Sequence, residues 1–254
     1  MANVKLENVY KIYPNGAKAV KDFSLDIQNE EFVVFVGPSG CGKSTMGRSV
    51  LRLLEPTDGQ VLFEGKDYTA LKSSELAKSR SDLQIIFQDP YASLDPRMTI
   101  GDIIGEPLDI QLKLPTKERM ERVLKTMERV GLNTRYVNRY PHEFSGGQRQ
   151  RIGIARAIVL GPKLMVCDEP VSALDVSVQA QVLNLLMDLQ KEMGMAYIFI
   201  SHDLSVIKHI SDRIMVMYLG HVVELADKDD LYKRTMHPYT TALLSAIPVP
   251  DRKH

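Results

Sequence analysis

The nine residues GPSGCGKST, Gly37 to Thr45, directly follow the apolar run FVVFV at Phe32 to Val36. They fit the pattern G-x-x-x-x-G-K-S/T, in which glycines let the backbone curl until several amide groups point inward. The helix expected next adds the partial positive charge of its N-terminus. We therefore predict a phosphate-binding loop in which Lys43 reaches the β- and γ-phosphates and Ser44 binds Mg²⁺. The residues expected at the nucleotide are Gly37, Pro38, Ser39, Gly40, Cys41, Gly42, Lys43, Ser44 and Thr45.

A second apolar run ends in two acids. KLMVCDEP, Lys163 to Pro170, has four apolar residues followed by Asp168 and Glu169. A buried strand that delivers Asp168 to its tip suits a contact with Mg²⁺, and Glu169 can then face the γ-phosphate and hold the attacking water. Two acids after a strand are often a solvated turn, but the phosphate-binding loop favours a catalytic pair. The two motifs predict a P-loop NTPase and leave GTPases, nucleoside kinases and helicases open.

The composition is that of an ordinary globular protein, with 44% hydrophobic and 25% charged residues among 254. Lysine and arginine number 32, as do aspartate and glutamate, so the formal net charge is zero. This balance gives no electrostatic footprint for nucleic acid, which we do not expect as a partner. The two cysteines, Cys41 and Cys167, form no CxxC motif and fit a reducing compartment. The longest apolar runs are only as long as strands, so a role at a membrane would need a partner chain.

Hydrophobic patterns divide the chain into segments of different character. Unbroken apolar runs at 32–36, 164–167 and 196–200 predict parallel strands that are covered on both faces. The first third of the chain reads as short strands punctuated by turns at Gly16, Gly37, Gly59 and Gly65.

Two helices are predicted from apolar stripes at helical spacing. TKERMERVLKTMERVGL, from Thr116 to Leu132, lies in a charged, helical stretch from 99 to 159 and has Gly131 placed to end its helix. The second helix follows Asp175, a plausible N-cap, and ends at Gly194, a plausible C-cap. The stretch from 99 to 159 looks like a helical subdomain inserted into an α/β core.

FSGGQRQR, Phe144 to Arg151, is the segment that narrows the class. A serine and two glycines in front of a helix make a second anion-binding N-terminus. One chain has no evident use for two phosphate cradles on a single nucleotide. Two copies that face head to tail would use both cradles, because each helix end then covers the γ-phosphate held by the loop of the other copy.

With this segment the sequence resembles the ABC ATPase family, whose signature LSGGQ is present here as FSGGQ. Phe144 replaces leucine, and we expect its side chain to pack and not to contact phosphate. The resemblance implies that Gln88 in QIIFQDP binds Mg²⁺ and water, that His202 in FISHDLS contacts the γ-phosphate, and that Tyr13 stacks on adenine. The family pattern also implies nucleotide contacts across a dimer from Ser145, Gly146, Gly147, Gln148 and Asp175.

Two longer segments, 87–108 and 237–248, look like the ATP-binding subunits of oligopeptide, dipeptide and nickel importers. They imply a transport-coupled ATP hydrolase that uses ATP and Mg²⁺, with di- or oligopeptides as the expected cargo and nickel or another small solute as the alternative. The implied partners are a second ABC ATPase (the same chain or a related one), transmembrane permease subunits and a solute-binding protein upstream. The implied location is peripheral, on the cytoplasmic face of the cell membrane.

The expected fold is α/β, with a P-loop (RecA-like) mixed-sheet core, an N-terminal antiparallel β subdomain and an inserted α-helical subdomain. We place the core and its β subdomain at 1–87 and 159–234. The helical subdomain, with the Q-loop around Gln88 and the signature, is placed at 88–158, and a C-terminal extension of the oligopeptide-transporter type at 235–254.

Three rival functions fit the sequence less well. A soluble ABC ATPase of DNA repair or translation usually carries two cassettes in one chain or long coiled-coil insertions, and needs a basic surface. A GTPase needs an N-K-x-D motif, which this sequence lacks. A non-catalytic ATP-binding module loses one of the reacting groups, whereas Lys43, Glu169 and His202 are all present.

Overall fold

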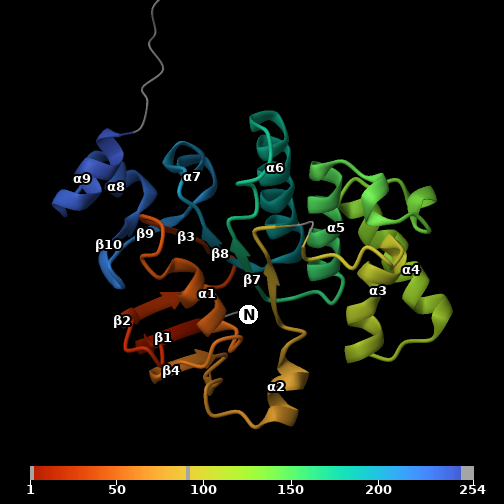
Figure 1. Cartoon of the computed structure of the whole chain (residues 1–254), viewed down its shortest axis with the longest axis horizontal. Coiled ribbons are helices and arrows are strands. Elements are labelled where there is room, and N and C mark those ends of the chain that lie inside the picture. Colours follow the sequence, from red (N-terminus) through yellow and green to blue (C-terminus); the bar gives the residue numbers. More distant parts are fainter. Residues whose placement is uncertain (1–2, 90–91, 247–254) are drawn as a thin grey trace, which may run out of the picture. The chain divides into compact units, whose positions relative to one another are not determined.

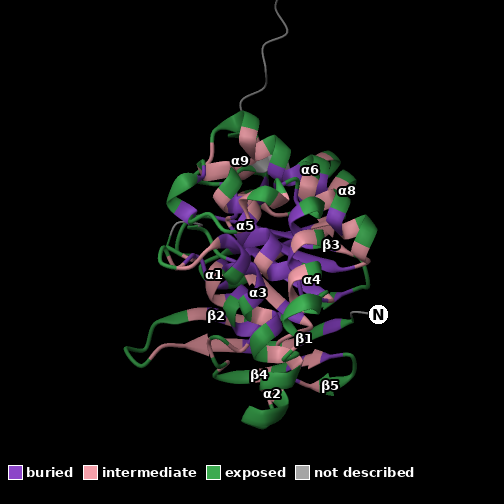
Figure 2. Cartoon of the chain, turned by 90° about the vertical axis from the view of Figure 1, so that its right-hand side faces the viewer, coloured by how far each residue is buried: buried purple, intermediate pink, exposed green. Residues whose placement is uncertain are grey.

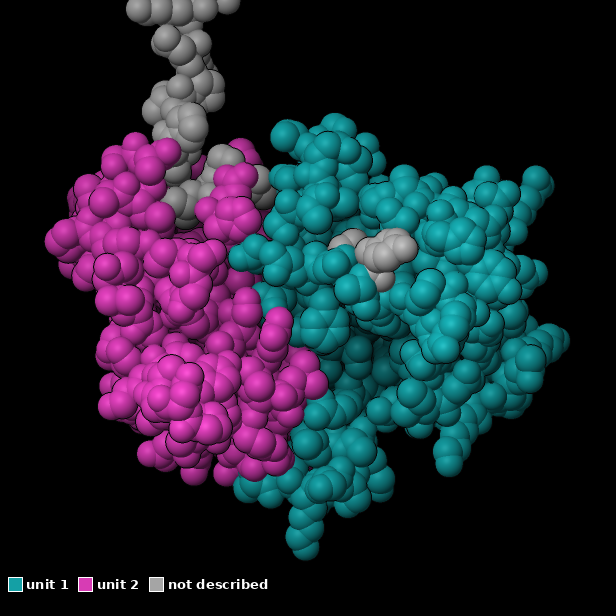
Figure 3. Space-filling model, in the orientation of Figure 1, with its two compact units in different colours: residues 1–2, 70–197 teal, residues 3–69, 198–254 magenta. Residues whose placement is uncertain are grey.

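The computed structural model of the chain describes residues 3–89 and 92–246. It divides into two compact units, one of residues 70–197 and the other of residues 3–69 together with the chain from Ile198 onward (Figure 3). Small parts of the two importer-like segments, at 90–91 and 247–248, lie outside the described residues, as does the end of the expected C-terminal extension.

The unit that contains the N-terminal region begins with an antiparallel sheet. Its strand order is β2-β1-β4-β5, and the strands are β1 (Val4–Ile12), β2 (Lys18–Ile27), β4 (Asp58–Phe63) and β5 (Lys66–Asp67). This confirms the predicted antiparallel strands (Figure 1). The turn expected at Gly59 is wrong, because Gly59 lies inside β4 at φ 84°, where an added Cβ would sit 2.2 Å from the carbonyl oxygen of Asn8. A glycine is needed there because the two strands approach closely at an irregular register.

The same unit holds a group of strands with the order β10-β9-β3-β8, of which β3, β8 and most of β9 are buried and β10 is more exposed. These are β3 (Phe32–Val36), β9 (Arg213–Tyr218), β10 (His221–Asp227) and, from Ile198 onward, β8 (Ala196–Ile200). β3 pairs with β9 in parallel, and all five residues of β3 are buried, as its unbroken apolar run predicts. The helices of this unit are α1 (Lys43–Val50), α7 (Leu204–Ile210), α8 (Lys228–Lys233) and α9 (Pro238–Ser245).

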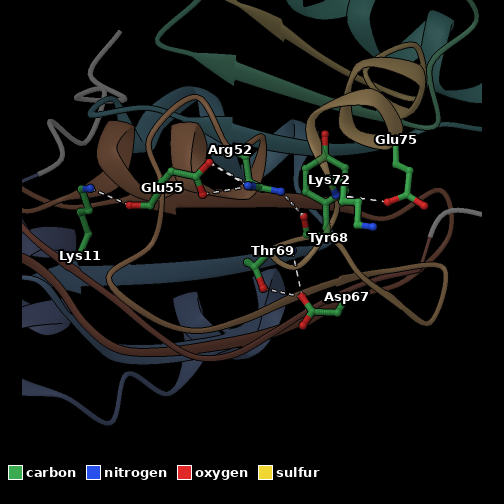
Figure 4. A network of polar contacts seen from close by, with 8 residues as sticks. All are labelled: Lys11, Arg52, Glu55, Asp67, Tyr68, Thr69, Lys72 and Glu75. Carbon is green, nitrogen blue, oxygen red and sulfur yellow. Dashed lines mark hydrogen bonds and ion pairs between the residues drawn. The ribbon is translucent and has the colours of Figure 1, made fainter.

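The C-terminal end of α1 is anchored by a polar network, shown in Figure 4. Arg52 donates two hydrogen bonds to the Glu55 carboxylate, at 3.0 and 2.9 Å, and a third to the Tyr68 carbonyl oxygen at 3.0 Å. Lys11 of β1 donates to the Glu55 carbonyl oxygen at 2.6 Å. These bonds tie the segment after α1 to the antiparallel sheet, and so hold the helix that the phosphate-binding loop leads into.

In its described residues, 70–89 and 92–197, the other unit combines a parallel strand pair with several helices. β6 (Leu83–Ile86) pairs in parallel with β7 (Leu164–Asp168), which is buried throughout. Helices α3, α4 and α5 pack on one another, and α5 also packs on α6 and β6. The helices are α2 (Ser73–Ser79), α3 (Ile100–Gln111), α4 (Thr116–Arg129), α5 (Gly146–Ile158) and α6 (Val176–Met193), with 3₁₀ turns at Thr134–Tyr136 and Pro141–Glu143.

Both predicted helices are confirmed. α4 is followed by Gly131 at φ 71°, and α6 begins after Asp175 as N-cap and ends at Gly194 at φ 65°. Buried residues concentrate on strands such as β3, whereas α2 has none (Figure 2). In the described part of the chain, every helix is too short or too polar to span a bilayer. The mixed α/β class is confirmed, and the boundaries of the three expected domains stay a prediction.

Candidate nucleotide-binding site

The segment from Gly37 to Thr45 begins directly after β3 and runs into the first turn of α1, as the sequence predicts. Glycine is required at both ends of the curl. An added Cβ would lie 2.2 Å from the Met217 carbonyl oxygen at Gly37, and 2.2 Å from the Ala19 carbonyl oxygen at Gly42. Both glycines have positive φ, at 151° and 107°. The neighbouring backbone therefore sets the shape of the loop, which leaves Pro38, Ser39 and Gly40 exposed.

Lys43 is buried within this loop, with 5% of its surface exposed. Its Nζ atom donates to the carbonyl oxygens of Gly37 at 2.8 Å and Pro38 at 2.9 Å, and lies 3.8 Å from Sγ of Cys41. No side chain caps α1, whose N-cap is Gly42 in a left-handed conformation. The first amides of a helix need partners from outside it, and a phosphate is a partner that suits them.

Two other predicted residues belong to the same unit as the loop. The hydroxyl of Tyr13 lies 3.3 Å from Oγ1 of Thr45, the last residue of the loop, so the Tyr13 ring is next to the start of α1. His202 is exposed and follows β8, next to Ser201, whose amide donates to the Phe35 carbonyl oxygen of β3 at 3.1 Å. The roles of Tyr13 toward adenine and of His202 toward the γ-phosphate stay predictions.

Sequence reasoning missed a contact that supports the loop from the turn between β9 and β10. The Gly220 amide donates to the Cys41 carbonyl oxygen at 3.0 Å, and the Gly220 carbonyl oxygen accepts from the Lys21 amide at 2.8 Å. Gly220 has φ 84°, which suits glycine at a tight turn. The glycine is visible in the sequence, but nothing local connects it to a loop far earlier in the chain.

In the other unit, Asp168 and Glu169 stand at the end of β7. Asp168 is 2% exposed, and Glu169 follows it with a left-handed φ of 49°. Such a backbone costs a non-glycine residue about 1–3 kcal/mol and is typical of functional positions. Ser172 helps to hold the turn, because its amide and hydroxyl donate to the Glu169 carbonyl oxygen at 3.3 and 3.1 Å.

Gln88 is brought to the side chain of Glu169. Its Nε2 donates to Oε2 of Glu169 at 3.1 Å, which joins residues 81 positions apart in the sequence. Gln88 therefore helps to orient the Glu169 carboxylate. The sequence predicts both residues at the site but not their hydrogen bond.

The signature segment forms the start of α5. Ser145 is its N-cap: Oγ accepts from the Gln148 amide at 3.4 Å, and Oε1 of Gln148 accepts from the Ser145 amide at 3.0 Å. This reciprocal pair is a capping box. Phe144 packs edge-on against Tyr136 and is 5% exposed, which confirms that its side chain packs.

The two signature glycines lie against the start of α6. An added Cβ at Gly147 would lie 2.5 Å from Cγ1 of Val178, and one at Gly146 would lie 3.6 Å from Cδ2 of Leu174. Asp175 caps α6 by accepting from the Val178 amide at 3.0 Å and the Ser177 hydroxyl at 2.9 Å. The hydrogen bond from the Val178 amide lowers the pKa of Asp175 most, and the one from the Ser177 hydroxyl lowers it further.

The donors that could hold Mg²⁺ are few. Within residues 3–89 and 92–246, no three or more His, Cys, Asp and Glu side chains gather in a way that could hold a metal ion. A magnesium ion bound with nucleotide usually takes only one or two protein oxygens, with phosphates and water supplying the rest. The Ser44 hydroxyl and the Asp168 carboxylate are oxygen donors of this kind.

Comparisons with known proteins identify two matching families. Residues 20–172 match the family described as ABC transporter, and residues 223–254 match the family described as Oligopeptide/dipeptide transporter, C-terminal region. The chain is 60% identical over 243 residues to "Oligopeptide transport ATP-binding protein OppF" of Bacillus subtilis, covering 94% of this chain and 80% of that protein. It is 58% identical over 239 residues to the protein of the same name from Escherichia coli, covering 94% and 72%.

Solved structures show the same fold. A dimeric ATP-binding cassette bound to ADP and phosphate in a post-hydrolysis state has a TM-score of 0.80 at 34% identity, covering 89% of this chain and 98% of that one. A Clostridium perfringens protein described as part of an ABC transporter complex has a TM-score of 0.83 at 28% identity, covering 91% and 90%.

Proposed function

We propose that this chain, which belongs to the ABC transporter family, is the ATP-hydrolysing subunit of an importer for di- or oligopeptides. As a member of that family it is a nucleotide-binding protein. The observation that carries the proposal is the pairing of Glu169, at the end of β7, with the amide of Gln88. The hydrogen bond restrains the Glu169 carboxylate, which supports its assignment as the water-activating group, and the phosphate-binding loop is the proposed substrate site.

Nucleotide binding is assigned to the loop and its helix. The amides of the loop and of the start of α1 donate to the phosphates. Lys43, which here donates to the carbonyl oxygens of Gly37 and Pro38, donates instead to the β- and γ-phosphate oxygens when nucleotide binds. Tyr13 stacks on adenine. Ser44, Asp168 and Gln88 are the residues that would hold Mg²⁺, which would supply positive charge against the β- and γ-phosphates.

Hydrolysis is an in-line attack of water on the γ-phosphorus. Glu169 orients the water and accepts its proton as the bond between the γ-phosphorus and the β-γ bridging oxygen breaks, which leaves ADP and inorganic phosphate. Lys43 and His202 stabilise the charge on the transferring phosphoryl group. A measurement of phosphate release tests this step: Glu169→Gln or His202→Ala at the wild-type rate would contradict it.

We propose that the working unit is a pair of cassettes, each placing Ser145, Gly146, Gly147 and Gln148 on the nucleotide of the other. The dimeric state of a solved relative supports this arrangement. So does Val176, an apolar residue with 82% of its surface exposed, directly after Asp175. The partner is a second copy of this chain or a related ATPase.

The cargo is assigned from the relatives named for oligopeptide transport and from the matched C-terminal region. The subunit then works at the cytoplasmic face of the membrane with permease subunits and a solute-binding protein. Uptake of a labelled tetrapeptide and of labelled nickel, in the source organism carrying Glu169→Gln, tests this choice. Loss of peptide uptake alone supports the proposal, whereas loss of nickel uptake alone would favour the alternative cargo.

Coupling to the permease is assigned to the segment after Gln88, residues 89–107. Two contacts link its described part to the signature helix and to the segment before it: Arg156 of α5 donates to the Ser93 carbonyl oxygen at 2.6 Å, and the Ile100 amide donates to the Arg139 carbonyl oxygen at 2.8 Å. If substitutions across 91–96 left transport fully coupled to hydrolysis, this assignment would be wrong.

A further inference from the structure

We propose that Tyr239 of the C-terminal helix α9 is a positioning residue for the phosphate-binding loop, so that its ring tunes the affinity for ATP. The proposal rests on the proposed function, because it concerns the same nucleotide site. It gives a role to a segment, His237 to Tyr239, that the nucleotide chemistry described above does not use. All of the contacts that carry it lie within one compact unit.

The first step is that α9 is fixed to β10, beside which it lies in Figure 1. Glu224 of β10 is 9% exposed, and its carboxylate accepts from the amides of Met236 at 2.8 Å and His237 at 3.1 Å. Nδ1 of His237 in turn caps the helix by accepting from the Tyr239 amide at 3.1 Å. The backbone that carries the Tyr239 ring is therefore held by a buried charge and by a helix cap.

The second step runs from Tyr239 to the end of β9. The rings of Tyr239 and Tyr218 have centroids 4.5 Å apart and planes inclined by 34°. Tyr218 is the last residue of β9, and the next two residues turn sharply with φ values of 49° at Leu219 and 84° at Gly220. The Tyr239 ring therefore packs on the residue from which this turn departs.

The third step joins that turn to the loop. The Gly220 amide donates to the Cys41 carbonyl oxygen at 3.0 Å, and the Met217 carbonyl oxygen lies against Gly37, leaving no room for a Cβ. Two points of the phosphate-binding loop thus rest on Met217, the residue before Tyr218, and on Gly220, the second residue after it. Burial raises the pKa of Tyr239, with smaller contributions from the charges of Cys41 and Tyr218.

Removal of the Tyr239 ring should loosen the turn and then the loop. An aromatic pair of this kind corresponds to about a two- to tenfold change in an equilibrium constant. Because the ring acts through the backbone of the phosphate-binding loop, the change should fall on ATP binding and not on the chemical step. Removal of a residue that merely stabilised the fold would not change ATP binding while leaving the chemical step intact.

The test uses the full chain and MgATP. Calorimetry in the Glu169→Gln background gives the Kd for ATP, and phosphate release in the otherwise wild-type chain gives kcat and KM. We expect Tyr239→Ala to raise Kd and KM about two- to tenfold with kcat almost unchanged, and Tyr239→Phe, which keeps the ring, to restore both. The matched control is Tyr232→Ala, which removes a ring from the neighbouring helix α8, where Lys208 Nζ lies 5.2 Å from its centroid.

A double-mutant cycle with Tyr218→Ala sharpens the test. If the two rings act as one pair, Tyr218→Ala with Tyr239→Ala binds ATP no more weakly than the weaker single variant. Circular dichroism checks that each variant is folded, and Tyr239→Leu replaces Tyr239→Ala where the alanine variant is not.

The outcomes separate the two proposals. A folded Glu169→Gln chain that bound no ATP would contradict the proposed function and this inference with it. Normal binding by that chain, together with a Kd for the Tyr239 variant equal to that of Tyr232→Ala, would overturn the inference alone. Fully additive effects of the two tyrosines would overturn it as well.

Discussion

The chain contains two helix starts suited to phosphate, and they are built in different ways. α1 begins at a glycine with no side-chain cap, and its loop buries a lysine whose Nζ rests on loop carbonyls. α5 begins at Ser145, whose hydroxyl and amide are both engaged by Gln148 of the same helix. Neither helix has an acidic residue in its first turn.

The difference indicates how each start is used. No side-chain cap occupies the start of α1, which suits a phosphate that binds whenever nucleotide is present. The start of α5 is held by its own capping box, so it keeps its shape without a ligand and can engage a phosphate that a second cassette presents. We infer that the first start determines nucleotide affinity and that the second determines whether bound nucleotide is hydrolysed.

The largest expected effect is on the chemical step of hydrolysis, which depends on a residue outside both helix starts. Glu169→Gln should lower kcat by about 10²- to 10⁴-fold, because it removes the group that activates water. The Kd for MgATP should change less than about twofold, since a neutral side chain of the same shape leaves the contacts to phosphate in place. Phosphate release and calorimetry measure the two quantities. An equal loss of kcat and of affinity for MgATP would mean that Glu169 acts in nucleotide binding.

Ser145→Ala tests the second start. Loss of a donor to the γ-phosphate should lower kcat by about 10²- to 10³-fold, with the Kd of the isolated chain for ATP unchanged. Thr99→Ala is the matched control, because Thr99 caps α3 in the same unit by accepting from the Asp102 amide at 3.2 Å. Both variants should unfold about 1 kcal/mol more easily, but only Ser145→Ala should lose hydrolysis. Equal activity would mean that Ser145 is a cap and nothing more.

Gly147→Ala tests the packing behind that start. Its Cβ would lie 2.5 Å from Cγ1 of Val178, and a valine in a helix has little freedom to rotate away. We expect a loss of about 1–3 kcal/mol in urea unfolding, relieved in part by adding Val178→Ala. Gly153→Ala, in the same helix with nothing within 4 Å of its Cβ, should instead be neutral or stabilising. A neutral Gly147→Ala would show that the start of α6 does not constrain the signature.

The smallest effect concerns a third helix start, that of α6. The pKa of Asp175 is below its usual range because the Val178 amide and the Ser177 hydroxyl donate to the carboxylate. Its contribution to stability is therefore complete above the unfolded pKa and is lost as the pH falls through the folded pKa. The stability difference between wild type and Asp175→Ala, from urea unfolding, should shrink from pH 7 toward pH 3. A constant difference would exclude the charged cap as its source.

Much of the secondary structure could be predicted from the sequence, because it depends on residues that are close together in the chain. An unbroken apolar run predicts β3, and a capping residue followed by helical spacing predicts the start of α6 at Asp175. The misplaced turn at Gly59 shows the limit, since that glycine is needed by the approach of β1 and not by its neighbours.

Contacts between distant segments could not be predicted. The hydrogen bond from Gln88 to Glu169 joins two motifs whose spacing says nothing about their side chains. The bond from Gly220 to Cys41 joins a hairpin turn to the phosphate-binding loop, and no periodic pattern relates them. Packing in three dimensions decides both contacts.

Sedimentation of Glu169→Gln with and without MgATP tests the central claim most directly, because slow hydrolysis preserves any complex that two starts form around one nucleotide. We predict a monomer without nucleotide and a dimer with it, formed by the chain alone or with the second ATPase of its transporter. A variant that binds MgATP yet stays monomeric, both alone and mixed with that ATPase, would contradict the account.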